Sequence, residues 1–311
     1  MSVLLLTHRA CLLHDPGEFH PECTDRMRAV LQALEAEEFM GLIRAEAPEA
    51  TPEQLRRVHP AGYVDAILSI RPEPGAPVPL DGDTIMSAGS AEAALRAAGA
   101  GVAAVDAVCR GEGGVRRAFC ATRPPGHHAE PSRPMGFCLF ANAVVAARHA
   151  QAAHGLARVA ILDFDVHHGN GTQDCVEADP TILFASSHQW PCYPGTGHAR
   201  EHGTGNVFNA CLPPGSDGTA FRAAWRDTLL PAVDAFAPEL LVISAGFDAH
   251  ARDPLAQLRV READFAWLTE ALCALADRHA AGRVVSILEG GYDLDALAAS
   301  TAAHVRTLMR A

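Results

Sequence analysis

The chain has 311 residues, of which 49% are apolar, and its 25 basic and 37 acidic side chains give a formal net charge of −12. This length and apolar content allow one large α/β domain or two smaller domains, and they exclude a disordered or collagen-like chain. Because acidic side chains outnumber basic ones, no basic surface is expected that could bind a phosphate backbone, so nucleic acid is not expected as a direct partner. The negative net charge is compatible with a cationic substrate but does not establish one.

Cysteine usage and hydropathy predict the compartment. The nine cysteines include no CxxC pair, and a thiolate zinc site or a disulfide framework would need closer spacing or pairing. We therefore expect buried, reduced thiols in a cytoplasmic protein. No run approaches the roughly 18 apolar residues of a membrane helix, so no membrane association is expected.

Short apolar runs alternate with longer helical patterns along the chain. The first run, Val3–Thr7, is too short for a signal peptide and predicts a buried strand. Further strands are predicted at Ala118–Ala121, Arg158–Phe164, Thr181–Ala185, Leu240–Ser244 and Val284–Leu288. Several of these runs are apolar on both faces, which is typical of parallel strands covered by helices on each side.

The helical patterns carry start signals. Thr24 is expected to cap a first helix, and Thr51, with Pro52 next and Gln54 three residues on, forms a capping box. Ala-rich segments of helical period are 89–109, 141–154, 218–235, 262–279 and 293–310. The Pro-rich stretch Arg71–Pro79 is expected to be a surface loop. The whole pattern predicts one doubly wound α/β domain, with functional loops at the carboxyl ends of its strands.

Side chains with metal-ligand chemistry follow two of the predicted strands. Alternate residues of a strand share a face, so Asp163, Asp165 and His167 would point the same way. Three such groups are costly to bury without a cation, although one alone could simply cap a turn. Asp248 follows the run 240–244; alone it is typical of a helix cap, but it completes an Asp, His, Asp set. Three protein ligands leave one position open for water, which indicates a catalytic metal site.

A proton-transfer group is expected beside such a metal. Two carboxylates cancel the charge of a dication, so the metal acidifies its water less and a general base is needed. His127 and His128 follow two prolines and a glycine, a rigid turn that holds side chains in one geometry. Tyr292, after two glycines, could donate its hydroxyl to an oxyanion facing the metal. A tyrosine packed on a turn is an equal alternative from this segment alone.

Together these segments resemble the histone deacetylase superfamily, in particular its class II branch with the bacterial deacetylase-like amidohydrolases. Each motif alone is weak, but their joint order is specific. The matching segments are His14–Gly17, His20–Glu22, Arg123–Ala129, Gly136–Cys138, Asp163–Gln173, Tyr193–Gly197, Gly246–Leu255 and Glu289–Tyr292. The resemblance implies one deacetylase catalytic domain over residues 1–311 with the arginase/deacetylase fold, a parallel sheet of about eight strands covered by helices on both faces.

The resemblance also implies zinc-dependent hydrolysis of the linear amide of an acylated lysine or another acylated amine. By motif position, Asp165, His167 and Asp248 would bind one Zn²⁺ per chain. His128 would be the general base and acid, and Tyr292 would polarise the acyl carbonyl.

Further roles follow from the same resemblance. His127, paired with Asp163, would give electrostatic help, and Asn170 follows the class II pattern as the partner of His128. The substrate would lie against Gly136, Phe137, Tyr193 and Leu255. A structural K⁺ would be held at the positions of Asp163, Asp165, His167 and Ser186.

Three alternatives share this fold. A two-metal ureohydrolase of the arginase type would need bridging carboxylates where the chain has Asn170 and His250. An acetylpolyamine deacetylase of the class II branch would carry Glu at the position of Leu255. A non-catalytic module that recognises acylated ligands would have lost Tyr292 or a metal ligand. We therefore expect an enzyme, and the residue at 255 weakens the polyamine choice.

The loops around the site do not specify its substrate. We expect the rim to be formed by His14–Glu22, Pro72–Ser87 and His188–Gly205. The second of these includes Asp83, in the region where peptide deacetylases often place a polar group that holds the substrate backbone. Long loops in this family can mediate dimers or tetramers, so a homo-oligomer is compatible with the sequence.

Overall fold

An eight-stranded parallel sheet organises the molecule in the computed structural model, which describes residues 2–311. Its strands lie in the order β2-β1-β5-β10-β9-β6-β7-β8. They are β1 (Ser2–Thr7), β2 (Ile43–Glu46), β5 (Val115–Cys120), β6 (Val159–Asp163), β7 (Ile182–Gln189), β8 (Val207–Leu212), β9 (Leu240–Ala245) and β10 (Val284–Leu288). A separate antiparallel pair is formed by β3 (Val78–Pro79) and β4 (Ile85–Met86). The predicted α/β class with a parallel sheet is confirmed.

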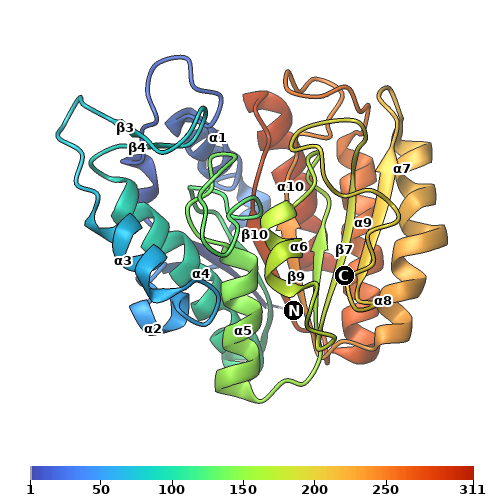
Figure 1. The fold of residues 1–311 in the computed structure, drawn as a ribbon. Coiled ribbons are helices and arrows are strands. Elements are labelled where there is room, and N and C mark those ends of the chain that lie inside the picture. Colours follow the sequence, from blue (N-terminus) through green and yellow to red (C-terminus); the bar gives the residue numbers. More distant parts are fainter. Residues whose placement is uncertain (1) are drawn as a thin grey trace.

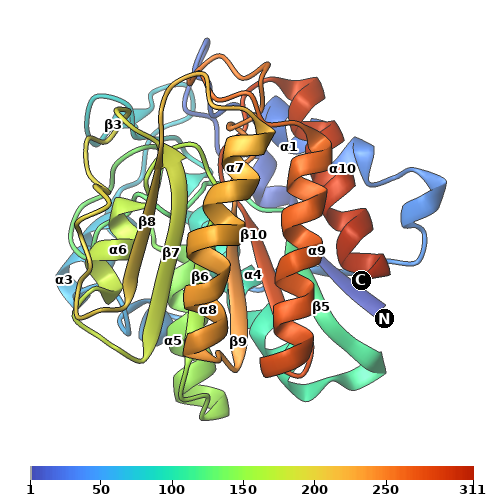
Figure 2. The same ribbon diagram turned by 90° about the vertical axis from the view of Figure 1, so that its right-hand side faces the viewer.

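Helices cover both faces of the sheet (Figure 1). They are α1 (Thr24–Ala33), α2 (Pro52–Leu55), α3 (Ala61–Ser69), α4 (Ser90–Arg110), α5 (Asn142–His154), α6 (Asn170–Val176), α7 (Gly218–Ala224), α8 (Leu230–Phe236), α9 (Glu262–His279) and α10 (Leu294–Arg310). Helices α4 and α5 pack on one face of the sheet, and Figure 2 shows α7, α8, α9 and α10 in front of the other. No helix within residues 2–311 is long and apolar enough to cross a membrane.

The strands are apolar on both faces because each face has its own core. Along β1, Val3 and Leu5 belong to the buried cluster that includes Leu268 of α9, whereas Leu4 and Leu6 belong to the cluster on the α4 and α5 side. Successive strand residues point to opposite faces, so one apolar run supplies both cores.

Helix starts agree with the sequence in one case and differ in another. Helix α2 has the predicted capping box, in which Gln54 N donates to Thr51 Oγ1 at 3.2 Å and Thr51 N donates to Gln54 Oε1 at 2.8 Å. The predicted cap at Thr24 is wrong. Cys23 occupies the N-cap of α1, because the Thr24 hydroxyl is used to hold the preceding loop, donating to the carbonyl of His14 at 3.3 Å.

The segment predicted as one helix at 218–235 changes its hydrogen bonding midway. Residues Trp225–Leu229 form a π turn between α7 and α8. Pro231, the second residue of α8, has no N–H to donate, which is a common cause of such irregularity.

The sequence pattern does not predict the two edge strands, β2 and β8. All four residues of β2 are exposed, so this strand has no apolar face to signal it. The predicted strand Arg158–Phe164 ends at Asp163 instead. Asp163 Oδ1 accepts from Asp165 N at 3.0 Å, and this local turn places Asp165 and His167 beyond the strand.

All strands of the sheet point the same way, so their carboxyl ends share one edge. The long loops gather at this edge, at the top of Figure 1. The polar segments that follow β5, β6, β9 and β10 meet there, since these four strands are neighbours in the middle of the sheet.

Candidate active site

Three buried side chains converge beyond the ends of β6 and β9. Asp165 Oδ1 and Asp248 Oδ2 each lie 3.2 Å from His167 Nδ1. Apart from this ion-pair contact with His167, Asp248 Oδ2 has no hydrogen-bond partner among residues 2–311. Burial together with Asp165 raises the pKa of Asp248 to about 7. Two carboxylates and an imidazole nitrogen that face one another in this way are a donor set for a cation such as Zn²⁺. The structure therefore brings together the three predicted metal ligands in a form that fits the metal.

Glycines make room for the two carboxylates. Gly290 N donates to Asp165 Oδ2 at 2.9 Å, and Val166 N donates to Asp248 Oδ1 at 2.8 Å. A Cβ at Gly290 would collide with the carboxylates of both acids, and a Cβ at Gly246 would collide with that of Asp165. Close approach of the backbone to the ligands is thus the reason for glycine at both positions.

The two adjacent histidines have different partners and opposite electrostatics. His127 Nδ1 lies 3.0 Å from Asp163 Oδ2, and His128 Nδ1 lies 2.8 Å from Asn170 Oδ1. Burial opposes the charge on His127, but Asp165 and Asp163 raise its pKa to about 10. Burial and the neighbouring His127 hold the pKa of His128 well below its usual range. His128 is therefore neutral at pH 7, as a general base must be, beside a cationic His127.

Sequence reasoning missed a buried carboxylate that holds the histidine turn. Glu289, at the end of β10, accepts from Gly126 N at 2.6 Å, from His127 N at 3.2 Å and from Ser244 Oγ at 3.2 Å. Burial raises the pKa of Glu289 to about 7. This side chain ties the turn that carries both histidines to β9 and β10. The only signal in the sequence is an acidic residue directly after an apolar run.

A cavity of about 210 Å³ opens beside His128 and His167. Its other lining residues are Asp83, Gly136, Phe137, Tyr193, Leu255 and Tyr292. The ring centroids of Phe137 and Tyr292 are 5.9 Å apart in an edge-to-face arrangement, and Tyr193 and Leu255 are 41% and 36% exposed. The four predicted substrate-binding residues thus share one cavity, and the structure adds Asp83 to its wall. A mostly apolar wall with one carboxylate suits an aliphatic amine derivative.

Tyr292 lines this cavity and is held from two sides. Its backbone N donates to Asp253 Oδ2 at 2.7 Å, and the guanidinium of Arg26 lies 4.9 Å from its ring centroid. Arg26 also donates to the carbonyls of Gly291, at 2.6 Å, and of Glu289. Burial raises the pKa of Tyr292 well above its usual range, so the phenol stays protonated and can donate a hydrogen bond.

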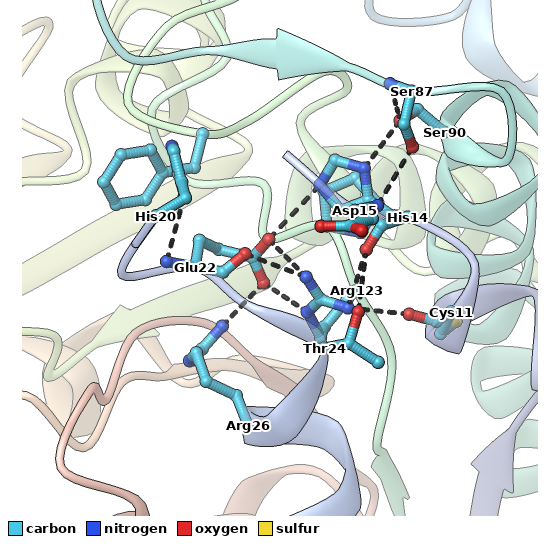
Figure 3. A network of polar contacts seen from close by, with 12 residues as sticks. Cys11, His14, Asp15, His20, Glu22, Thr24, Arg26, Ser87, Ser90 and Arg123 are labelled. Atoms are coloured by element: carbon cyan, nitrogen blue, oxygen red, sulfur yellow. Dashed lines mark hydrogen bonds and ion pairs between the residues drawn. The ribbon is translucent and has the colours of Figure 1, made fainter. Parts of the chain in front are cut away.

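A buried charge network holds the loop that precedes α1 (Figure 3). Glu22 is buried and pairs with Arg123, with Arg26 Nη1 at 2.8 Å and with His14 Nε2 at 3.2 Å. Arg123 Nη1 also donates to the carbonyl of Cys11 at 2.8 Å. Burial opposes the charge on Glu22, but Arg123 and His14 hold its pKa far below the usual range. The network joins the first loop to the turn that carries the two histidines.

The expected rim is therefore wrong in part. His14 and Glu22 are buried, because their charged groups are paired inside the network just described. His188 is buried as well, with Nε2 lying 2.8 Å from the carbonyl oxygen of Gly197. Phe19, by contrast, is 94% exposed.

Ser186, predicted to take part in K⁺ binding, is buried on β7, next to β6. It is the register partner of Asp163 across β6 and β7, and its Oγ lies 2.9 Å from His188 Nδ1. Potassium binding stays a prediction.

A second group of metal-ligating side chains lies on α4 and α5. Asp106 Oδ1 lies 2.8 Å from His149 Nε2 and 2.7 Å from His154 Nε2. Arg57 donates to His149 Nδ1 at 3.1 Å, so in its neutral form that ring carries its proton on Nε2 and donates it to Asp106. Hydrogen bonds account for this group, in contrast to the unpartnered oxygen of Asp248.

Comparisons with known proteins show what the whole chain resembles. The family model described as "Histone deacetylase domain" matches residues 20–308. "Histone deacetylase 14, chloroplastic" of Arabidopsis thaliana is 40% identical, over 98% of this chain and 76% of its own length. The "Histone deacetylase-like amidohydrolase" of Pseudomonas aeruginosa is 40% identical, over 88% of this chain and 72% of its own. The crystal structure of the HDA15 HD domain matches with a TM-score of 0.91 at 36% identity, covering 99% of this chain and 88% of that one.

Proposed function

Because the chain belongs to the histone deacetylase family, we propose that it is a zinc-dependent deacetylase. It removes acetyl or related acyl groups from acylated lysine in proteins, peptides or small lysine-like molecules. The observation that carries this proposal is the buried convergence of Asp165, His167 and Asp248 next to an apolar cavity that His128 and Tyr292 also line.

The residues of the site divide the work of amide hydrolysis. Zn²⁺ held by Asp165, His167 and Asp248 would polarise the acyl carbonyl and acidify water. His128, neutral at pH 7, accepts a proton from the attacking water and returns it to the leaving amine. The protonated hydroxyl of Tyr292 donates to the carbonyl oxygen as that oxygen gains negative charge.

The cavity wall favours acyl-lysine as the substrate. Phe137, Tyr193 and Leu255 offer apolar surface to the methylene stem of a lysine. Asp83 places one carboxylate on the wall, where it would accept an N–H of the substrate. Leu255 offers no carboxylate to a remote ammonium group, unlike the Glu expected there in a polyamine deacetylase.

A second candidate is deacetylation of an acylated polyamine by the same groups. The carboxylate of Asp83 and the net charge of −12 favour a cationic substrate.

A two-metal ureohydrolase has less support, because the chain has Asn170 and His250 where bridging carboxylates would be needed. The Asn170 amide contacts His128, and His250 Nε2 lies 3.3 Å from Glu262.

Side-by-side turnover of an acetyl-lysine peptide, acetylputrescine and a longer acyl-lysine, with and without chelator, tests the proposal. We expect chelator-sensitive release of acetate, fastest from the peptide, and its loss in folded Asp165→Ala and Tyr292→Phe variants. Parent rates in both variants would contradict the site assignment, and two Mn²⁺ per chain would favour the ureohydrolase.

We place the enzyme in the cytoplasm as part of the same proposal, and a homo-oligomer is compatible with it.

A further inference from the structure

Asn170, the partner of the proposed general base, has a second contact on its far side. Its Oδ1 lies 2.8 Å from His128 Nδ1, and its Nδ2 donates to Glu130 Oε1 at 3.0 Å. Met135 Sδ is a further acceptor for the same Nδ2, at 3.3 Å. Asn170 is buried, whereas the side chain of Glu130 is 22% exposed.

The acceptors on this far side determine which way the amide points. The two ends of an asparagine amide are similar in size but opposite in role, since the oxygen accepts and the nitrogen donates. A carboxylate and a thioether can only accept, so Glu130 and Met135 hold the amide nitrogen on their side. The amide oxygen is thereby turned toward His128.

The orientation of the amide in turn determines the tautomer of His128. An amide oxygen can only accept, so Nδ1 of the ring must carry the N–H. A neutral imidazole has a single N–H, which leaves the lone pair on Nε2. This is the tautomer that can take a proton from water in the cavity that His128 lines.

We propose that Glu130 is a positioning residue that fixes the amide of Asn170 and, through it, the base-competent tautomer of His128. This inference rests on the proposed function, since the tautomer matters only if His128 is the base. Glu130 is itself held, because Arg133 Nη2 donates to its Oε1 at 2.8 Å and Glu130 N donates to the carbonyl of Arg133 at 3.0 Å.

Replacement of the carboxylate tests the orientation. In Glu130→Ala only the weak thioether acceptor remains, so the amide can turn and donate to Nδ1, which places the N–H on Nε2. We expect kcat to fall at least tenfold with KM near the parent value, because Glu130 does not line the cavity. In Glu130→Gln, the donor-only guanidinium of Arg133 would hold the new amide oxygen where Oε1 now accepts from Asn170, so kcat should stay within threefold of the parent. Arg133→Ala removes the ion pair but not the acceptor, and should also stay within threefold.

A double-variant cycle separates orientation from a general structural role. In Asn170→Asp the carboxylate accepts at both ends, so His128 keeps its Nδ1–H whichever way the side chain turns. Removing Glu130 in that background also removes a like charge. We therefore expect Glu130→Ala to cost nothing in kcat when residue 170 is aspartate. An equal fall of kcat in both backgrounds, or no fall in the parent background, would overturn the proposal.

Ring ¹⁵N shifts of labelled histidine give a readout that does not need turnover. The signal of His128, identified by its loss in His128→Gln, should show Nδ1–H in the parent and Nε2–H in Glu130→Ala. The same tautomer in both proteins would overturn the proposal. If the parent hydrolysed none of the three acylated amines, the proposed function would fail, and this spectrum would still decide whether Glu130 controls the tautomer.

Discussion

The guanidinium of Arg26 lies 4.9 Å from the ring centroid of Tyr292, although the two residues belong to opposite ends of the chain. Arg26 also donates to the carbonyls of Glu289 and Gly291, on either side of the glycine that touches the metal ligands. One side chain of α1 thus fixes both the backbone turn and the ring that the turn carries. The orientation of the proposed oxyanion donor therefore depends on the first helix.

We expect Arg26→Lys to lower kcat by roughly 10- to 100-fold, because an ammonium cannot hold both carbonyls and cover the ring. KM should change little. Steady-state kinetics check this, with Arg28→Lys as the control, since Arg28 lies on the same helix, is exposed and pairs with Asp25. Similar kcat values for the two variants would contradict this role of Arg26.

Metal analysis distinguishes the two groups of potential ligands. We expect one Zn²⁺ per chain, and Asp248→Asn should weaken zinc affinity by more than about 100-fold because a direct ligand loses its charge. Asp106→Asn should leave the zinc content unchanged, since hydrogen bonds satisfy that group. Mass spectrometry of dialysed protein measures the zinc content of both variants. Zinc loss in Asp106→Asn alone would assign the metal to the group on α4 and α5 instead.

Glu22 makes stability depend on acid pH. Its pKa is depressed in the fold, so the ionised carboxylate stabilises the protein above its ordinary pKa of 4.5, and this stability is lost as the pH falls below that value. At pH 7 we expect Glu22→Gln to lower the free energy of unfolding by about 3–5 kcal/mol, since it leaves buried arginines without their partner.

Denaturant unfolding of parent and Glu22→Gln at several pH values measures this difference. It should shrink between pH 5 and pH 3. Glu18→Gln, in the same loop but exposed, serves as the control and should match the parent throughout. A difference between parent and Glu22→Gln that is independent of pH would contradict the charge network as its cause.

Gly290→Ala should damage the metal site without touching a ligand. The added methyl group would collide with the carboxylates of Asp165 and Asp248, so zinc affinity should fall roughly 10- to 100-fold. Gly62→Ala, in α3, meets nothing within 4 Å, and should raise helix stability by about 0.5–1 kcal/mol with zinc affinity unchanged. Zinc titration of both variants decides the matter; parent-like affinity in Gly290→Ala would contradict the crowding.

Leu255→Glu should move the preference of the enzyme toward polyamines. A carboxylate at the cavity mouth would meet the remote ammonium of acetylputrescine, so the kcat/KM ratio of acetylputrescine over acetyl-lysine peptide should rise about tenfold, or 1.4 kcal/mol. Leu13→Glu adds the same charge at a leucine that is 60% exposed and does not line the cavity, and should leave the ratio unchanged. Equal shifts in both variants would indicate a general effect of charge.

Elements buried on both faces could be predicted from the sequence. Strand β10 lies at Val284–Leu288, where its apolar run predicts it. Strand β2 could not be predicted, because all four of its residues are exposed and it is held by backbone pairing with β1. Apolar periodicity reports burial, so it does not detect a strand that is held by backbone pairing alone.

The same limit applies to the site. The ligands Asp165 and His167 are two residues apart, so their spacing is legible in the sequence. The contacts of two buried carboxylates cannot be read in this way. Glu289 accepts from Gly126, which lies 163 residues earlier, and Glu22 pairs with Arg123, which lies 101 residues later. Such contacts depend on the order of strands in the sheet, and no local pattern encodes that order.

The order of the central strands also determines when the chemistry can first assemble. Strand β10, late in the chain, lies between β5 and β9, so it separates the histidine turn from the last metal ligand. While the ribosome is still making residues before 284, the segments after β5 and β9 have no common neighbour to align them. A chain that has reached residue 283 carries both histidines of the turn and all three metal ligands, but the strand that aligns the turn with those ligands is still missing. The site therefore assembles only once β10 has inserted between β5 and β9.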